Sequence, residues 1–227
     1  MFAFRGVSVS RALINLKAIS SRQGNQQMQP SKPRQSAVHR QTKETDIDLK
    51  LLIDGSGGAD IKTGVPFMDH MLTLLTVHGF FDLTIKASGD TEVDDHHTVE
   101  DLGICLGRAL KEALRDGAGI KRYGEAAIPM DETLVRICLD ISNRPFIHYE
   151  VKLKETKTGN FDTSLAKEFL RALVTHAGIT MHVDMIRGEN AHHIIEAVFK
   201  GLGKALDTAT TIDPRLTGTV LSSKGSI

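Results

Sequence analysis

The feature that most constrains this chain is a motif that occurs twice, 96 residues apart. Residues 96–100 and residues 192–196 both read His-His-x-x-Glu, and the residues that follow also match at this offset. Further upstream, two positions recur at an offset of 98, where His70 and His78 pair with Glu168 and His176. Several blocks that share nearly one offset indicate a duplicated structural unit. We therefore expect two halves with the same fold.

The hydropathy pattern of each half predicts the order strand, helix, strand, helix. Alternating apolar residues predict strands over residues 47–53, 81–87, 135–141 and 179–185. Length and apolar spacing predict helices over residues 65–79, 96–114, 163–176 and 191–210. The expected fold is α+β, with two duplicated halves that are each a mainly antiparallel sheet with helices on one face. The repeats would span about 44–120 and 121–215, within a body of residues 40–225.

A separate segment is expected before this body. Residues 1–43 contain eight basic residues and no acidic one, so the net charge of zero hides a basic start and a body of −8. Residues 1–39 are therefore predicted to be a basic, disordered leader. Two interpretations remain open, an organellar transit peptide and a non-native or mis-assigned start, for which Met28 offers an alternative initiator.

Composition excludes several classes of protein. A chain without a basic excess is not typical of a nucleic-acid binder, and no apolar run is long enough to cross a bilayer. Two cysteines cannot build a disulfide framework. Neither is expected to be a metal ligand, because Cys105 lies in a predicted helix and Cys138 in a predicted strand. Of four further histidines, His182 is left open as ligand or structural residue, and three are expected to be structural or solvated, namely His39, His148 and His176.

The His-His-x-x-Glu motif predicts metal binding. On a helix, His96 and Glu100 share a face, whereas His97 points about 100° away around the axis. Each motif thus offers ligands in two directions, which suits two metal ions better than one. Imidazole and carboxylate ligands together fit Mn, Fe, Zn or Ni.

Five segments bring the sequence close to a known family. It resembles the imidazoleglycerol-phosphate dehydratases over residues 40–225, through residues 67–72 (FMDHML), 78–82 (HGFFD), 94–101 (DDHHTVED), 192–197 (HHIIEA) and 222–225 (SSKG). The resemblance implies a hydro-lyase of histidine biosynthesis that dehydrates D-erythro-imidazoleglycerol phosphate to imidazole acetol phosphate. It also implies two Mn²⁺ per active site, sites between subunits, and a homo-oligomer of about 24 subunits with closed symmetry. The implied partner is the phosphorylated imidazole substrate, with neither nucleic acid nor membrane.

The same resemblance implies roles for particular residues. The implied metal ligands are His70, His96, His97, Glu100, Glu168, His192, His193 and Glu196. Many members have His where this chain has Glu168, and we keep Glu168 because it is the repeat partner of His70. The implied substrate-binding residues are Glu44, His70, His78, Arg122, Arg144, Lys200, Ser222 and Lys224, the last two in a C-terminal phosphate-binding loop. Glu44 and Glu196 are the acid/base candidates, with Asp131 as a weaker third.

Two other functions use the same residues differently. A metal-storage protein would need the histidine helices but not the cations at Arg122, Arg144 and Lys224. A metal-dependent hydrolase of a phosphorylated small molecule would keep an open metal position for water. The expected compartment is the cytoplasm, because the body resembles bacterial members, with a plastid or mitochondrion as the alternative if the leader is cleaved.

Overall fold

The computed structural model describes residues 33–227, so the predicted leader lies almost entirely outside the described residues. The first strand begins at Gln35, which moves the start of the folded body ahead of residue 40. Within the described part of the chain, no helix has the length and apolar character that a membrane span requires.

The first half contains one four-stranded sheet and two helices. Its strands are β1 (Gln35–Gln41), β2 (Thr45–Leu52), β3 (Ala59–Lys62) and β4 (Asp82–Gly89), and its helices are α1 (Pro66–Gly79) and α2 (His96–Leu114). The strand order is β1-β2-β4-β3. The β1–β2 and β2–β4 pairs are antiparallel, and β3 runs parallel to β4.

The second half repeats this topology. Its strands are β5 (Tyr123–Met130), β6 (Thr133–Ile141), β7 (Phe146–Glu150) and β10 (Ile179–Arg187), in the order β5-β6-β10-β7. Its helices are α3 (Leu165–Ala177) and α4 (Ala191–Thr210). The edge strand β7 pairs in parallel with β10, just as β3 pairs in parallel with β4 in the first half. A hairpin of β8 (Lys157–Thr158) and β9 (Phe161–Asp162) is inserted before α3, and a short 3₁₀ helix (Pro214–Leu216) follows α4.

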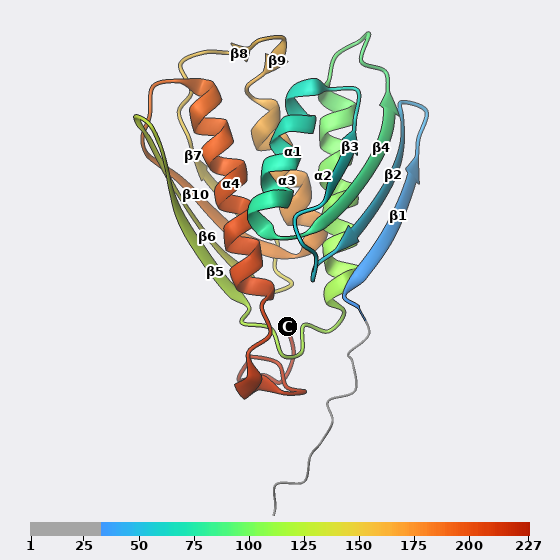
Figure 1. The fold of residues 1–227 in the computed structure, drawn as a ribbon, viewed down its shortest axis with the longest axis vertical. Helices are drawn as coiled ribbons and strands as arrows, with labels where there is room; N and C mark the ends of the chain where they lie inside the picture. Colours follow the sequence, from blue (N-terminus) through green and yellow to red (C-terminus); the bar gives the residue numbers. More distant parts are fainter. Residues whose placement is uncertain (1–32) are drawn as a thin grey trace, which may run out of the picture. The chain divides into compact units, whose positions relative to one another are not determined.

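The four helices lie between the two sheets (Figure 1). α2 packs on β1 and β2, α4 packs on β5 and β6, and the layers meet where α1 contacts α4 and α2 contacts α3. The alternating residues predicted as strands point their apolar side chains into these layers; Ile47, Leu49, Val135 and Ile137 are all buried. The fold is therefore α+β with two similar halves, each with helices on one sheet face, as the repeat predicted.

Local sequence explains where the site-bearing helices begin. Pro66 occupies the first turn of α1, where its missing N–H costs no helical hydrogen bond. At α4, the Asn190 side chain caps the helix by accepting hydrogen bonds from the backbone N–H groups of His192 and His193. His192 and His193 thus stand in the first turn of a helix whose start is capped by a side chain.

Candidate active site

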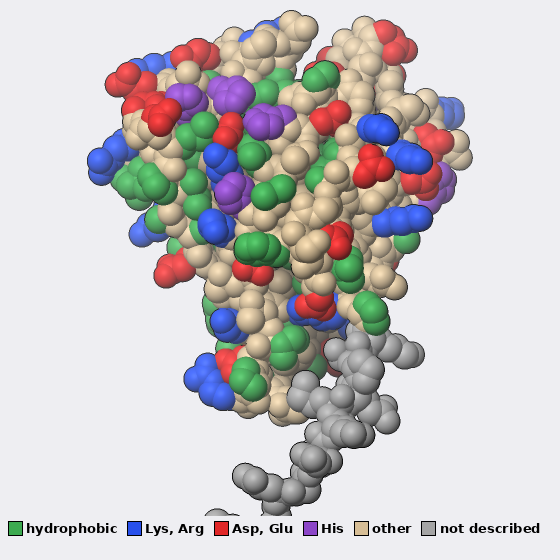
Figure 2. All heavy atoms as spheres, in the orientation of Figure 1, with side chains coloured by type: hydrophobic (Ala, Val, Ile, Leu, Met, Phe, Trp, Pro, Cys, Tyr) green, Lys and Arg blue, Asp and Glu red, His purple; other side chains and the backbone are tan. Residues whose placement is uncertain are grey.

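Three predicted ligands form a cluster at the contact between α1 and α4. Nε2 of His70 lies 3.3 Å from Oε2 of Glu196, and Nε2 of His192 lies 3.1 Å from the same oxygen. Among residues 33–227, this is the one group whose possible ligand atoms all lie within 4.8 Å of one another. Figure 2 shows histidine side chains gathered on one face of the molecule. Two imidazoles and a carboxylate at this spacing fit a divalent ion such as Mn²⁺.

Lys200 lies beside the cluster rather than at a separate phosphate site. Its Nζ lies 2.6 Å from Oε1 of Glu196, one helical turn away. Burial by itself would raise the pKa of Glu196, but the hydrogen bonds from Lys200 and His70 outweigh it and lower that pKa. Burial, with the nearby charges of Lys200 and Lys204, lowers the pKa of His78. Glu196 therefore stays ionised, as a metal ligand must.

A second group forms where the β1–β2 turn meets the start of α2. Nδ1 of His97 lies 3.0 Å from Oδ2 of Asp90, and this hydrogen bond raises the pKa of His97. Nε2 of the same ring lies 4.0 Å from Oε1 of Glu44. The acid/base candidate Glu44 is thus next to a predicted metal ligand, and Asp90 leaves the far ring nitrogen of His97 available.

The second half contains a corresponding group. Nδ1 of His193 lies 2.9 Å from Oε2 of Glu132, and this contact raises the pKa of His193. Asp131 is 3.9 Å from the same nitrogen and is largely exposed. Glu132 directly precedes β6, which begins at Thr133, just as Glu44 directly precedes β2, which begins at Thr45. Glu132 is therefore the counterpart of Glu44 in the repeat. Hydrogen bonds from the backbone of Asn190 and the His193 side chain lower the pKa of Glu132.

The other predicted ligands that belong to this kind of cluster, His96, Glu100 and Glu168, are not drawn together within a single copy of the chain. His96 and Glu100 approach each other at 3.7 Å on α2. Glu168 on α3 instead forms an ion pair with Arg171 through Oε2 of its carboxylate. By the repeat, these three residues correspond to the cluster of His192, Glu196 and His70. Although Arg171 occupies its Oε2, the Glu168 carboxylate offers oxygen ligands of the kind that a divalent ion accepts.

The predicted phosphate-binding residues line a pocket of about 730 Å³ near the C-terminus. The side chains of Arg144, Ser222 and Lys224 reach it. The guanidinium of Arg122 donates two hydrogen bonds to the Asp140 carboxylate, from Nε at 2.6 Å and from Nη2 at 3.0 Å. Its Nη1 donates to the carbonyl of Leu221 at 2.7 Å. Arg122 therefore holds the C-terminal segment in place. The Arg144 side chain is largely exposed and lies 3.6 Å from Asp140, so it can meet an anion in the pocket more readily than Arg122 can.

This pocket and the histidine cluster lie at opposite ends of α4. The backbone N–H of Arg122 donates to the carbonyl of Ala209 at 2.8 Å, in the last turn of the helix. His192 is in the first turn, 17 residues earlier, which corresponds to about 25 Å along the axis. One small phosphorylated molecule cannot span that length, so the predicted site residues do not form one site within one chain.

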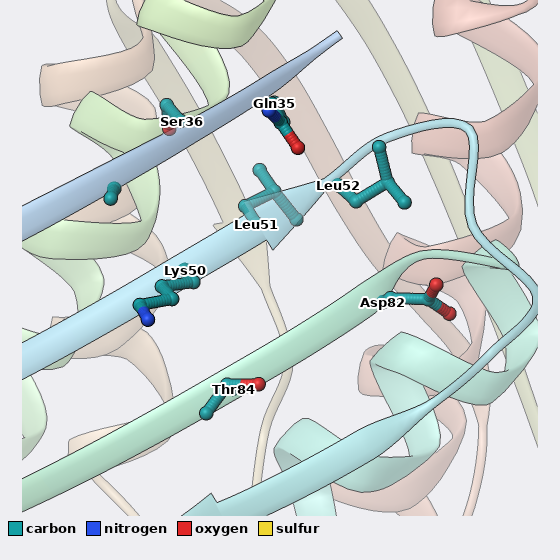
Figure 3. A pocket seen from close by; sticks show the side chains of 8 residues that line it. Gln35, Ser36, Lys50, Leu51, Leu52, Asp82 and Thr84 are labelled. Carbon is teal, nitrogen blue, oxygen red and sulfur yellow. The ribbon is translucent and has the colours of Figure 1, made fainter. Parts of the chain in front are cut away.

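Another pocket, of about 400 Å³, lies on the outer side of the first sheet (Figure 3). None of the predicted site residues line it; its lining residues are Gln35, Ser36, Ala37, Lys50, Leu51, Leu52, Asp82 and Thr84. We do not assign it to the active site.

Two carboxylates that contact site histidines, Asp90 and Glu132, were not predicted from the sequence. Asp90 lies in the irregular segment before α2 and has no repeat partner that signals its role. Glu132 had a usable signal, because its offset of 88 from Glu44 matches the spacing of the two strand starts, Thr45 and Thr133.

Comparisons with known proteins identify the chain. Residues 63–206 match the sequence profile of imidazoleglycerol-phosphate dehydratase. The imidazoleglycerol-phosphate dehydratase of Desulfotalea psychrophila is 56% identical over 86% of this chain and 98% of that protein. That of Bacillus subtilis is 57% identical over 83% and 96%. The Staphylococcus aureus enzyme structure matches at a TM-score of 0.72 with 43% identity, covering 79% of this chain and 99% of that one. A Pyrococcus furiosus structure matches at 0.73 with 41% identity, covering 84% and 100%.

These likenesses cover nearly the whole length of each relative and include the duplicated fold and the histidine helices. The chain is therefore an enzyme of the hydro-lyase class, which cleaves carbon–oxygen bonds. It belongs to the imidazoleglycerol-phosphate dehydratase family of histidine biosynthesis.

Proposed function

We propose that the protein dehydrates D-erythro-imidazoleglycerol phosphate to imidazole acetol phosphate with the help of two bound divalent ions, Mn²⁺ by the resemblance. The observation that carries the proposal is the cluster of His70, His192 and Glu196, which already places three ligand atoms within 4.8 Å. The bacterial relatives, matched over nearly their full length, support the cytoplasm as the compartment.

The metal ligands are assigned residue by residue. His70, His192 and Glu196 would hold one ion, and their repeat counterparts Glu168, His96 and Glu100 would hold the second. His97 and His193 point away from these groups and would complete sites on other copies of the chain. When bound, the metal supplies a Lewis acid that polarises the imidazole ring of the substrate.

Proton transfer is assigned to Glu44. The proton to be removed lies on the carbon bonded to the imidazole ring, and it is weakly acidic. Glu44 projects from the β1–β2 turn, is more than half exposed, and lies 4.0 Å from Nε2 of His97. Through a bound metal ion, His97 would hold the imidazole ring of the substrate close to Glu44. The Glu44 carboxylate could then take this proton. Glu196 is less suited, because its two oxygens are used by Lys200 and the two histidines.

The substrate phosphate is assigned to the C-terminal pocket. Arg144 and Lys224 supply cations and Ser222 a hydroxyl, and such donors bind phosphate oxygens well. Arg122 positions this segment through Asp140 and the Leu221 carbonyl.

We further propose that the active site is assembled between subunits of a large homo-oligomer, about 24 copies by the resemblance. The separation of about 25 Å between the phosphate pocket and His192 favours this arrangement. The described chain also exposes large apolar side chains, which are common at protein interfaces. They include Val77, Phe80, Val93, Tyr123 and Phe146.

The test is a product assay with the imidazole substrate on chelated, dialysed protein, followed by addition of single divalent ions. We expect loss of turnover after chelation and its recovery with Mn²⁺, with a ketone as product. A Glu44→Gln variant in the same assay should bind the metal ions normally and lose most turnover, about 100-fold or more, because acid–base catalysis contributes about 10²–10⁴-fold.

Full activity after exhaustive chelation would exclude the metal-assisted reaction. Release of inorganic phosphate in place of the ketone would favour a phosphatase. Near-normal turnover of the Glu44→Gln variant would remove Glu44 from proton transfer while leaving the metal assignment intact.

A further inference from the structure

A row of potential metal ligands crosses the outer face of the second sheet. Cys138 on β6 is paired directly with Glu125 on β5 and with His182 on β10, and His182 is paired with His148 on β7. Directly opposed residues on neighbouring strands have Cβ atoms about 4.5–5.5 Å apart. The register therefore places a carboxylate, a thiol and two imidazoles side by side on four adjacent strands.

All four side chains lie on the face that points away from the helices. On β6, the neighbours of Cys138 in sequence, Ile137 and Leu139, are buried against the helix layer, whereas Cys138 is only partly buried. His148, His182 and Glu125 are exposed. They can therefore change rotamer without disturbing the core.

Two neighbouring pairs of the row are already in contact, although its ligand atoms are less tightly gathered than those of His70, His192 and Glu196. The ring centroids of His148 and His182 are 5.6 Å apart, and the Cys138 thiol lies 4.0 Å from Oε2 of Glu125, to which it donates a weak hydrogen bond. Within residues 33–227, neither of these histidines forms an ion pair, whereas the next row is occupied by the pair Arg136–Asp184. The imidazole nitrogens are thus available.

We propose that Cys138, His182 and His148 form a binding site for a divalent transition metal of the zinc class, separate from the active site. Thiolate and imidazole are the ligands that zinc and cobalt prefer in proteins. His182, in the middle strand, would be the central ligand, with Cys138 and His148 leaning in from the strands on either side. Glu125 orients the thiol and accepts its hydrogen bond before binding; the thiol proton is released to solvent when the metal–sulfur bond forms.

The proposal departs from the expectation from sequence that Cys138 and His148 are not ligands, and it assigns His182, which was left open there, as a ligand. The alternation of β6 identified Cys138 as a strand residue, but the partners opposite it depend on register between strands that are distant in sequence. Only the pairing of β5, β6, β10 and β7 brings the four residues together.

The sulfur donor makes this site distinguishable from the active site. The proposed active-site ligands offer only nitrogen and oxygen. The one other thiol, Cys105, is fully buried in α2, and burial raises its pKa to about 11. A thiolate-to-metal charge-transfer band in the cobalt-loaded protein can therefore arise from Cys138 without interference from the histidine helices.

The experiment is a titration of the full-length, assembled, metal-stripped protein with Co²⁺, followed in the near-ultraviolet. We expect a sulfur-to-cobalt charge-transfer band that saturates at one thiolate-bound ion per chain and is displaced by Zn²⁺. Cys138→Ser should abolish the band. His182→Gln should weaken the apparent affinity at least about 10-fold, since removing even an outer partner of a metal ligand costs 10–100-fold.

Two controls separate this site from the rest of the chain. His39→Gln changes an exposed histidine on the first sheet, which pairs with Asp48, and should leave the band intact. Dehydratase turnover of Cys138→Ser should remain at the wild-type level, so failure of the proposed function and failure of this site give different results. Absence of the band in the wild-type protein, or its persistence in correctly folded Cys138→Ser, would overturn the proposal.

Discussion

At the scale of single residues, the second histidine of each repeated motif has one ring nitrogen occupied by a carboxylate. Asp90 holds Nδ1 of His97, and Glu132 holds Nδ1 of His193. Such a contact fixes the tautomer and leaves Nε2 as the nitrogen available for a metal. The two halves reach the same result differently, because Asp90 precedes α2 whereas Glu132 comes from the β5–β6 turn.

Glu132 has a larger structural role than its exposure suggests. Besides His193, its other oxygen accepts hydrogen bonds from the backbone N–H groups of Glu189 and Asn190, at 3.2 and 2.9 Å. Because Asn190 caps α4, Glu132 connects the β5–β6 turn to the start of that helix. Its carboxylate therefore positions His193 both directly and through the helix cap.

This arrangement gives a prediction for Glu132→Gln. The amide oxygen can still accept from the backbone, so we expect the fold to remain, while loss of the negative charge beside His193 weakens Mn²⁺ binding about 10–100-fold. Metal affinity is measured by calorimetric titration. The matched control is Glu150→Gln, which removes an exposed carboxylate of β7 that pairs with Lys152. Unchanged Mn²⁺ affinity in a folded Glu132→Gln protein would show that Glu132 does not act on the metal.

At the scale of secondary structure elements, the predictions from sequence succeeded for the interior of each sheet and missed its edges. The four strands predicted from alternation correspond to β2, β4, β6 and β10, which are the central strands of the two sheets. Their inward residues are buried on one face, so the alternation is strong. The strands of these two sheets that the alternation did not reveal, β1, β3, β5 and β7, are all edge strands.

The edge strands lack a clear pattern for physical reasons. β3 contains four residues that are mostly exposed, and β5 contains Gly124 and Pro129. Proline is tolerated at an edge because one side of the strand has no partner to receive a hydrogen bond. By contrast, the helix bounds of α2 and α4 were predicted without error, since both helices are long and begin at the repeated motif.

The helix layers approach closely at glycines. A Cβ built on Gly203 of α4 would lie 2.4 Å from the carbonyl oxygen of Leu75 on α1, and one on Gly107 of α2 would lie 2.6 Å from that of Leu173 on α3. These glycines are repeat partners, 96 residues apart. The close approach helps to bring His70 on α1 next to His192 and Glu196 on α4.

We therefore predict that Gly203→Ala destabilises the protein. Alanine favours a helix over glycine by about 1 kcal/mol, but the added methyl group must push α1 and α4 apart, and overpacking costs about 1–3 kcal/mol. The net loss is expected to be up to about 2 kcal/mol, seen as a lower Tm at fixed protein concentration. Lys204→Ala, the exposed neighbour on the same helix, should change Tm little. A Tm of Gly203→Ala at or above wild type would contradict the close packing.

At the scale of the whole molecule, the sequence predicted which residues belong to the candidate site but not where the fold places them relative to one another. The repeated motif and the family resemblance predict the metal ligands, and the resemblance alone predicts the acid/base candidate and the phosphate-binding residues. The fold then distributes them among the α1–α4 contact, the β1–β2 turn and the C-terminal pocket. Distances along α4 were implicit in the sequence, since helix length follows from residue number, but only the packing of Arg122 against Ala209 reveals that the pocket is at the far end.

This separation leads to a prediction about mixed oligomers. Arg144→Ala removes a cation from the phosphate pocket, and His192→Ala removes a ligand from the cluster about 25 Å away along α4. Each variant alone should be nearly inactive. If one site takes its phosphate pocket from one chain and its histidine cluster from another, an oligomer containing both variants has some sites with neither defect. The two variants, co-expressed with different affinity tags and purified through both tags, should therefore be far more active than either parent.

The assembly itself is checked in the same samples by light scattering, where about 24 copies of a 24.8 kDa chain correspond to about 0.6 MDa. Separately purified variants mixed without subunit exchange are the control, since they have the same composition but no shared sites, and should stay inactive. Mixed oligomers of full size that are no more active than the parents would mean that each chain completes its own site, and the arrangement of phosphate pocket and histidine cluster on separate subunits would then be wrong.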